Sequence, residues 1–149
     1  MDLWRISKYS SLSGEGGLRY SARWHSAGKR IVYLAESPAG ALIEVLVHME
    51  LNEKSWPRHY NLMRVTAPDD LETETIKVPG DDWRQSLRIT REIGDEWLDS
   101  RRTALARVPS AILPNTWNAL LNPARPTADQ IRVVETIRAE YDPRLFAKS

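Results

Sequence analysis

The chain has 149 residues, a length typical of one domain, and 21 basic against 20 acidic residues leave a formal net charge of +1. The absence of cysteine excludes disulfides and thiolate catalysis, and the near-neutral charge argues against direct nucleic-acid binding. No apolar run is long enough for a membrane span or a secretory signal. We therefore expect one cytoplasmic domain over residues 1–149, without membrane contact.

The N-terminal third predicts two short strands separated by a loop. Residues 3–6 fit a short first strand, and residues 31–35, a short and partly β-branched apolar run, are typical of a buried strand. Residues 10–17 are rich in Ser and Gly, which is loop composition. This arrangement leaves a long connection between the first two strands.

A helix follows from Pro38 to about Glu50. Ser37 before Pro38 is typical of a helix start, because Ser caps the first free N–H groups and Pro suits the first turn. Apolar residues then cover a broad arc, with Glu44 on the remaining side. A carboxylate flanked by so many apolar residues lies either at the wet edge of the helix or in a pocket.

The rest of the chain predicts an alternation of short elements. Four segments have a strand pattern: 59–65, 76–78, 104–108 and 111–113. Three have helical spacing or composition: 83–89, 93–98 and a turn at 115–121. Residues 131–137 alternate as a strand would, but Thr127 and Gln130 also fit a helix start. Together these elements predict an α/β or α+β domain.

Common catalytic and binding motifs are absent from the sequence. The glycine-rich residues 14–17 lack the Lys and Ser or Thr of a phosphate loop and the spacing of a dinucleotide loop. His25, His48 and His59 have no metal-ligand spacing, so we predict no metal site. No Gly-x-Ser-x-Gly motif marks a serine hydrolase.

Arg23, Tyr33 and Glu44 form a candidate site if the helix folds back on the strand before it. An Arg fork binds phosphate oxygens, an aromatic face packs on a ring, and a carboxylate stabilises the positive charge that develops when a glycosidic bond breaks. Each also has an ordinary interpretation, as a surface ion-pair partner, a core aromatic and a solvated helix residue. Composition and spacing alone leave this choice open.

Several ordered motifs together resemble the RES-domain toxins, a family named for an Arg, a Glu and a Ser, which here match Arg23, Glu44 and Ser110. The resemblance extends over nearly the whole chain and rests on these segments: Gly14-Glu15-Gly16, Arg23-Trp24, residues 31–37, residues 41–48, Val108-Pro109-Ser110, Asn118 and Asn122-Pro123. The chain departs from the pattern at Ala22 and His25, where the family usually has Gly and Asn.

The resemblance implies a fold similar to the ADP-ribosyltransferases, with a mixed β core and flanking helices, and it favours a strand for residues 131–137. It implies cleavage of NAD⁺ at the nicotinamide–ribose bond, with NAD⁺ as substrate and no separate cofactor. It also implies neutralisation by an Xre-type antitoxin with a helix-turn-helix domain, and it admits a homodimer within that complex.

On this hypothesis Arg23 holds phosphate or ribose oxygens, Tyr33 packs against the nicotinamide ribose, and Glu44 stabilises the cationic transition state. Further hydrogen-bonding or anion-holding groups are Ser110, Asn118 and Arg5. The sequence leaves other functions open: ADP-ribosylation of a protein target, a non-catalytic nucleotide-binding module, and a protein-interaction domain.

Overall fold

The computed structural model describes residues 1–49 and 57–146. Within them, seven strands form one mixed sheet in the order β4-β5-β6-β2-β1-β3-β7. Only the β4–β5 pair is parallel in this part of the chain. The strands are β1 (Asp2–Ile6), β2 (Val32–Ala35), β3 (His59–Thr66), β4 (Thr73–Thr75), β5 (Leu105–Pro109), β6 (Trp117–Leu121) and β7 (Arg132–Glu140).

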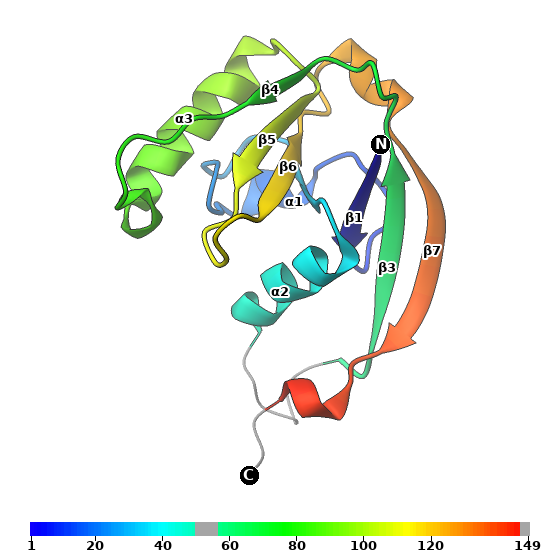
Figure 1. Ribbon diagram of the computed structural model, residues 1–149. Helices are drawn as coiled ribbons and strands as arrows, with labels where there is room; N and C mark the ends of the chain where they lie inside the picture. The colour runs from blue at the N-terminus through cyan, green and yellow to red at the C-terminus, as the bar shows by residue number, and fades with distance from the viewer. Residues whose placement is uncertain (50–56, 147–149) are drawn as a thin grey trace.

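Helices flank this sheet, which confirms the predicted mixed α/β fold. They are α1 (Gly16–Arg19), α2 (Pro38–His48) and α3 (Leu87–Ser100), with 3-10 turns at Trp83–Gln85, Pro126–Gln130 and Pro143–Leu145. In Figure 1, α3 lies at the β4–β5 end of the molecule and β7 at the opposite edge, with α2 between them. The strands predicted at 3–6, 31–35, 59–65, 104–108 and 131–137 are confirmed.

The α2 helix begins as its sequence predicts. The Ser37 hydroxyl accepts a hydrogen bond from the Gly40 N–H at 2.9 Å, and Pro38 occupies the first helical position. The helix ends at His48, with Met49 as its C-cap. Its predicted last residue, Glu50, lies outside the described residues. Because α2 contacts both β1 and β2, it crosses the middle of the sheet and brings Glu44 there.

Three predictions in the second half of the chain are wrong, two because of strand pairing distant in sequence and one because of a local side-chain bond. The strand expected at 76–78 lies at Thr73–Thr75, where it pairs with β5. Residues 111–113 turn rather than extend, because the Ser110 hydroxyl accepts from two N–H groups of this segment. The turn expected at 115–121 is strand β6, which is paired on both sides, with β2 and β5.

Helix α3 replaces the two helices predicted at 83–89 and 93–98. Trp83–Gln85 forms a 3-10 turn. Ser86 then caps α3, which continues past Gly94 without interruption. A Cβ atom on Gly94 would lie 1.6 Å from the carbonyl oxygen of Trp24. The glycine therefore does not interrupt the helix; it makes room for the backbone of a distant loop.

The two faces of the sheet carry two separate cores. Along β6, Leu120 packs with Trp97 of α3, whereas Leu121 packs on the other face with Leu3 of β1. Because side chains alternate along a strand, Asn118 shares the face of Leu120, and the register of β6 with β2 adds Tyr33 to that face. The pleat of the sheet thus brings Tyr33 and Asn118 to one side.

The sheet opens between β1 and β2. Within the described residues these two strands share a single register pair, Trp4 with Ala35, whereas β1 and β3 pair along five residues. Residues of both strands therefore line a common cavity instead of bonding to each other.

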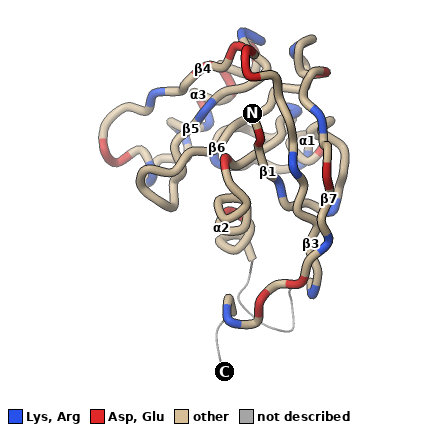
Figure 2. Tube along the Cα trace, turned by 45° about the vertical axis from the view of Figure 1, so that its right-hand side comes forward, with Lys and Arg blue, Asp and Glu red and all other residues tan. Residues whose placement is uncertain are grey.

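Charged residues of both signs follow the strands at the β7 edge (Figure 2). Arg64 of β3 lies 3.2 Å from Glu135 of β7, and the same guanidinium lies 3.7 Å from Asp2 of β1. Such exposed pairs contribute little to stability but keep the surface close to neutral.

We expect Gly94→Ala to lower the free energy of unfolding by about 1–3 kcal/mol, because the new methyl group must displace either the helix or the Trp24 carbonyl. Urea denaturation measures this change. Gly16→Ala is the matched control, since a Cβ there meets nothing within 4 Å. Equal stability of both variants would contradict the tight approach of the loop to α3.

Candidate active site

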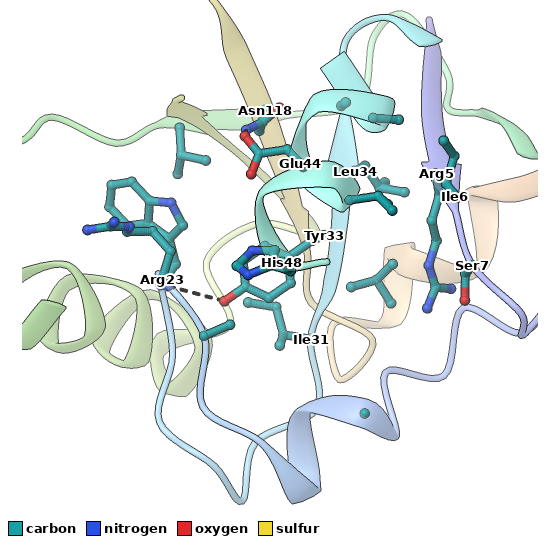
Figure 3. Close-up of a pocket in the computed structure, with 18 of the residues that line it drawn as sticks. Arg5, Ile6, Ser7, Arg23, Ile31, Tyr33, Leu34, Glu44, His48 and Asn118 are labelled. Atoms are coloured by element: carbon teal, nitrogen blue, oxygen red, sulfur yellow. Dashed lines mark hydrogen bonds between the residues drawn. The ribbon is translucent and has the colours of Figure 1, made fainter. Parts of the chain in front are cut away.

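A cavity of about 580 Å³ occupies the opening between β1 and β2. Its walls include the end of β1, the loop that carries Arg23, β2, the side of α2 that bears Glu44, and Asn118 of β6. Figure 3 shows Glu44 and Asn118 together, with Arg23 and Arg5 on opposite sides of the cavity. The structure thus brings Arg5, Arg23, Tyr33, Glu44 and Asn118 to one cavity.

Glu44 is held by uncharged groups. Its Oε1 accepts a hydrogen bond from Nδ2 of Asn118 at 2.9 Å and a longer one from the Ser110 hydroxyl at 3.4 Å. Among the described residues it forms no ion pair. The carboxylate is thereby oriented without having its charge neutralised.

Ser110 supports the site from behind. Its side chain is buried, it is not among the cavity-lining residues, and its oxygen accepts the N–H groups of Ile112 and Leu113 at 3.1 and 3.2 Å. With two N–H donors on its oxygen, its own proton is directed to Glu44. Ser110, which was expected to bind the ligand, instead orients Glu44 in this geometry.

Asn118 carries a buried acceptor without a partner. Its Nδ2 donates to Glu44, but its Oδ1 is shielded from solvent and has no hydrogen-bond partner among the described residues. Leaving a buried carbonyl oxygen unpaired costs free energy. Because Asn118 lines the cavity, a ligand N–H or O–H is well suited to pair with this oxygen.

Arg23 is anchored by a backbone carbonyl. Its guanidinium donates from Nη1 to the carbonyl oxygen of Arg84 at 2.9 Å, and it has no ion-pair partner within residues 1–49 and 57–146. This contradicts the alternative in which Arg23 is an ordinary surface ion-pair residue. Its remaining donors stay available to an anion in the cavity.

A buried chain of hydrogen bonds fixes the loop of Arg23 on β2. The Nε2 atom of His25 lies 3.2 Å from the carbonyl oxygen of Gly17 and must carry the proton, because a carbonyl only accepts. In the neutral ring, Nδ1 then accepts from the Tyr33 hydroxyl at 2.7 Å, and that hydroxyl accepts the Trp24 N–H at 3.1 Å. Both ring nitrogens of His25 and the Tyr33 hydroxyl therefore have hydrogen-bond partners.

This chain determines what Tyr33 offers the cavity. Burial raises the pKa of Tyr33 above its ordinary value, and the hydroxyl is already engaged twice. The ring, rather than the hydroxyl, is thus free to contact a ligand. Burial also lowers the pKa of His25, so its neutral form is favoured.

Sequence reasoning missed the role of His25. His25 was noted as a departure from the family pattern, where Asn is usual; an Asn oxygen can accept from a Tyr hydroxyl as the His ring nitrogen does here. Ala22, the other departure, contributes backbone atoms: its N–H bonds the carbonyl of His25 at 3.1 Å. Both departures are compatible with the same loop.

Arg5 lies on the β1 side of the cavity. Its Nη1 donates to the carbonyl oxygen of Ser11 at 2.8 Å, and burial lowers its pKa from the ordinary value. Arg5 therefore provides a second guanidinium on the opposite side from Arg23 (Figure 3). Two separated cations and one oriented carboxylate suit an elongated ligand that carries phosphates and a centre of developing positive charge.

Two negative findings concern only residues 1–49 and 57–146. No group of three or more His, Cys, Asp or Glu side chains there is arranged to hold a metal ion. In the same residues no helix is both long and apolar enough to cross a membrane.

The profile of the RES domain matches residues 2–142. A protein named Toxin Res from Pseudomonas putida is 44% identical over 147 residues, covering 98% of this chain and 100% of the relative. A protein named Prs ADP-ribosylating toxin from Sphingobium sp. is 35% identical over 158 residues, covering 98% of this chain and 97% of the relative. The resemblance found in the sequence is confirmed.

The fold is similar to a chain in the crystal structure of the Mycobacterium tuberculosis MbcT–MbcA toxin–antitoxin complex, with a TM-score of 0.68. The similarity covers 97% of this chain and 85% of the other, at 19% sequence identity. At this identity the likeness supports the fold.

We expect stability to fall as the pH drops from about 7.5 to 5.5, because the unfolded chain protonates His25 near its ordinary pKa of about 6.5 whereas the native pKa lies lower. The loss continues until the native imidazole also protonates. Melting temperatures across this range measure it.

His25→Asn is the control, because an amide accepts from Tyr33 but does not titrate. Since His48 and His59 remain in both proteins, the difference between the two pH profiles isolates His25. Parallel profiles would show that the buried imidazole does not govern this pH dependence.

Proposed function

The chain belongs to the RES domain family, and from that premise we propose that it is a toxin that cleaves the nicotinamide–ribose bond of NAD⁺. One observation carries the proposal: a carboxylate and a guanidinium face one cavity, and within the described residues each lacks a partner of opposite charge. A substrate with phosphates at one place and a developing cation at another would supply both partners.

Glu44 stabilises the reacting sugar in this mechanism. As nicotinamide departs, the ribose ring gains oxocarbenium character, and a fixed carboxylate nearby lowers the energy of that state. Asn118 and Ser110 hold the carboxylate in place before the substrate arrives, so little reorganisation is needed during the reaction.

Arg23 and Arg5 bind the pyrophosphate and ribose oxygens, and the Tyr33 ring packs against the nicotinamide end. Departure of nicotinamide cancels the positive charge on its ring, so the leaving group needs no protonation. The protein therefore supplies positioning and electrostatics and needs no covalent nucleophile.

The acceptor is water or phosphate in the first form of the proposal. A second form, transfer of ADP-ribose to a protein, is supported by the Sphingobium relative, which is named Prs ADP-ribosylating toxin. Both forms use the same bond cleavage and differ only in the nucleophile that reaches the ribose.

We further propose an Xre-type antitoxin as partner, a cytoplasmic location, and a homodimer within the complex. The structural likeness to a toxin–antitoxin complex and the relatives named as toxins support an antitoxin partner. The net charge of +1 is consistent with leaving DNA contact to that partner.

Product analysis after incubation with NAD⁺ labelled in the adenylate part tests the proposal. Free nicotinamide with ADP-ribose indicates hydrolysis. Free nicotinamide with phosphorylated ADP-ribose, formed in phosphate buffer, indicates phosphorolysis. Label bound to protein in an added cell extract indicates transfer. Release of no nicotinamide under all three conditions would refute the proposed activity.

We expect Glu44→Gln to lower turnover by about 100–1000-fold with NAD⁺ binding largely kept, because the amide preserves shape but lacks the charge that stabilises the cation. Nicotinamide release and NAD⁺ titration calorimetry measure the two effects. Glu92→Gln on the exposed face of α3 is the control. Near-normal turnover of the Glu44 variant would exclude its central role.

We expect Arg23→Lys to lower kcat/KM by about 10–100-fold although the charge is kept, because Lys lacks the planar fork that binds a carbonyl and phosphate oxygens together. Steady-state kinetics of nicotinamide release measure this. Arg88→Lys, in an exposed pair with Glu92, is the matched control. Unchanged kinetics would remove Arg23 from the site.

A further inference from the structure

One face of α3 holds the backbone of the loop that carries Arg23. The Thr90 hydroxyl lies 2.6 Å from the carbonyl oxygen of Arg23, and Nε of Arg91 lies 2.8 Å from that of Ala22. One turn further along, Gly94 abuts the carbonyl of Trp24, and Oδ1 of Asp95 accepts the N–H of Ser26 at 2.9 Å. Backbone groups of four loop residues thus meet residues 90–95 of α3.

We propose that Thr90 is a positioning residue that sets the direction of the Arg23 side chain through the Arg23 carbonyl. The inference rests on the proposed function, in which Arg23 binds substrate phosphate or ribose oxygens. Thr90 is not among the residues that line the cavity, so it would act only through Arg23.

The direction of the Thr90 proton supports this role. A helical Thr usually donates to a carbonyl of the preceding turn. Here those alternatives, the carbonyl oxygens of Ser86 and Leu87, lie at 3.4 and 3.2 Å, whereas the Arg23 oxygen lies at 2.6 Å. The one hydroxyl proton is therefore committed to the loop.

Burial makes this bond hard to replace. Thr90 is 0% exposed, and Gly94, one turn along the same face, is also buried. Without the hydroxyl, the Arg23 carbonyl would lose its donor in a place that water reaches poorly. The loop would relieve this by shifting, and Arg23 would shift with it.

Two supports then act on the loop from opposite sides. The Tyr33 hydroxyl holds the Trp24 N–H from the sheet, and Thr90 holds the Arg23 carbonyl from α3. The peptide group between Arg23 and Trp24 is thereby pinned at both its oxygen and its nitrogen. This peptide fixes the backbone end of the Arg23 side chain, and the bond to the Arg84 carbonyl holds its guanidinium end.

Three variants of the full chain test the proposal. Thr90→Val keeps the shape and removes the hydroxyl, and Thr90→Ser restores the hydroxyl. Thr103→Val is the matched control, because the buried Thr103 hydroxyl donates to the Leu105 carbonyl at 2.7 Å and accepts from Trp97 without lining the cavity. Amide hydrogen exchange of residues 20–28 and the kinetics of NAD⁺ cleavage are measured on each.

We expect Thr90→Val to speed exchange in residues 20–28 and to raise KM for NAD⁺ about tenfold with a smaller change in kcat, because binding by Arg23 is used before and during the reaction. Thr90→Ser should restore both readouts, and Thr103→Val should lose stability without changing either. An unchanged KM in Thr90→Val, or an equal rise in Thr103→Val, would overturn the proposal.

The two hypotheses fail separately. If the wild-type chain releases no nicotinamide, the proposed activity is refuted, and hydrogen exchange alone then decides the role of Thr90. In that case faster exchange limited to residues 20–28 in Thr90→Val supports positioning of Arg23, and unchanged exchange overturns it.

Discussion

The Tyr33 hydroxyl accepts the Trp24 N–H and donates to a buried, neutral His25, and these bonds fix the segment that carries Arg23 on a central strand. His25 completes the chain by donating to the Gly17 carbonyl. Gly17 must be glycine, because a Cβ there would lie 2.3 Å from the carbonyl oxygen of Lys29. In a buried network each bond depends on the others being made, so one tyrosine oxygen links the glycine-rich segment, the Arg23 loop and the sheet.

The opening of the sheet between β1 and β2 provides the cavity that the Arg23 loop borders. Because β1 and β2 share one register pair among the described residues, the strand that carries Arg5 diverges from the strand that carries Tyr33. The space between them is bounded by α2, which adds Glu44. A continuous ladder at this position would have satisfied the backbone of both strands but left no cavity. The strands on both sides of the cavity are fixed by the core of the sheet, to which β1 contributes Leu3 and β2 contributes Val32.

Local signals predicted part of this structure. Ser37 and Pro38 predicted the start of α2, and the apolar surroundings of Glu44 marked it as unusual before its contacts were known. The partners of Glu44 could not be predicted in this way, because Asn118 is 74 residues distant and belongs to a strand whose local pattern resembled a helical turn. The helices predicted at 83–89 and 93–98 lie in one region dominated by α3, where Gly94 is required by the close approach of the Trp24 carbonyl, a contact that sequence periodicity does not contain. Pairing and close backbone approach, both non-local, account for these errors.

The charges of the site are held by neutral groups. An amide and a hydroxyl orient Glu44, and a backbone carbonyl orients Arg23. Within the described residues the two charges therefore do not neutralise each other. Had Arg23 and Glu44 formed an ion pair, a substrate would first have to break it, and the field at the ribose would be weaker. Neutral supports fix the direction of each charge while leaving its field directed into the cavity, which is the electrostatic preorganisation that cleavage of a charged glycosidic bond requires. The two supports of Glu44 are also shielded: Ser110 is buried and both bonds to the carboxylate are partly buried, so they hold one geometry, whereas fully exposed groups would exchange partners with solvent.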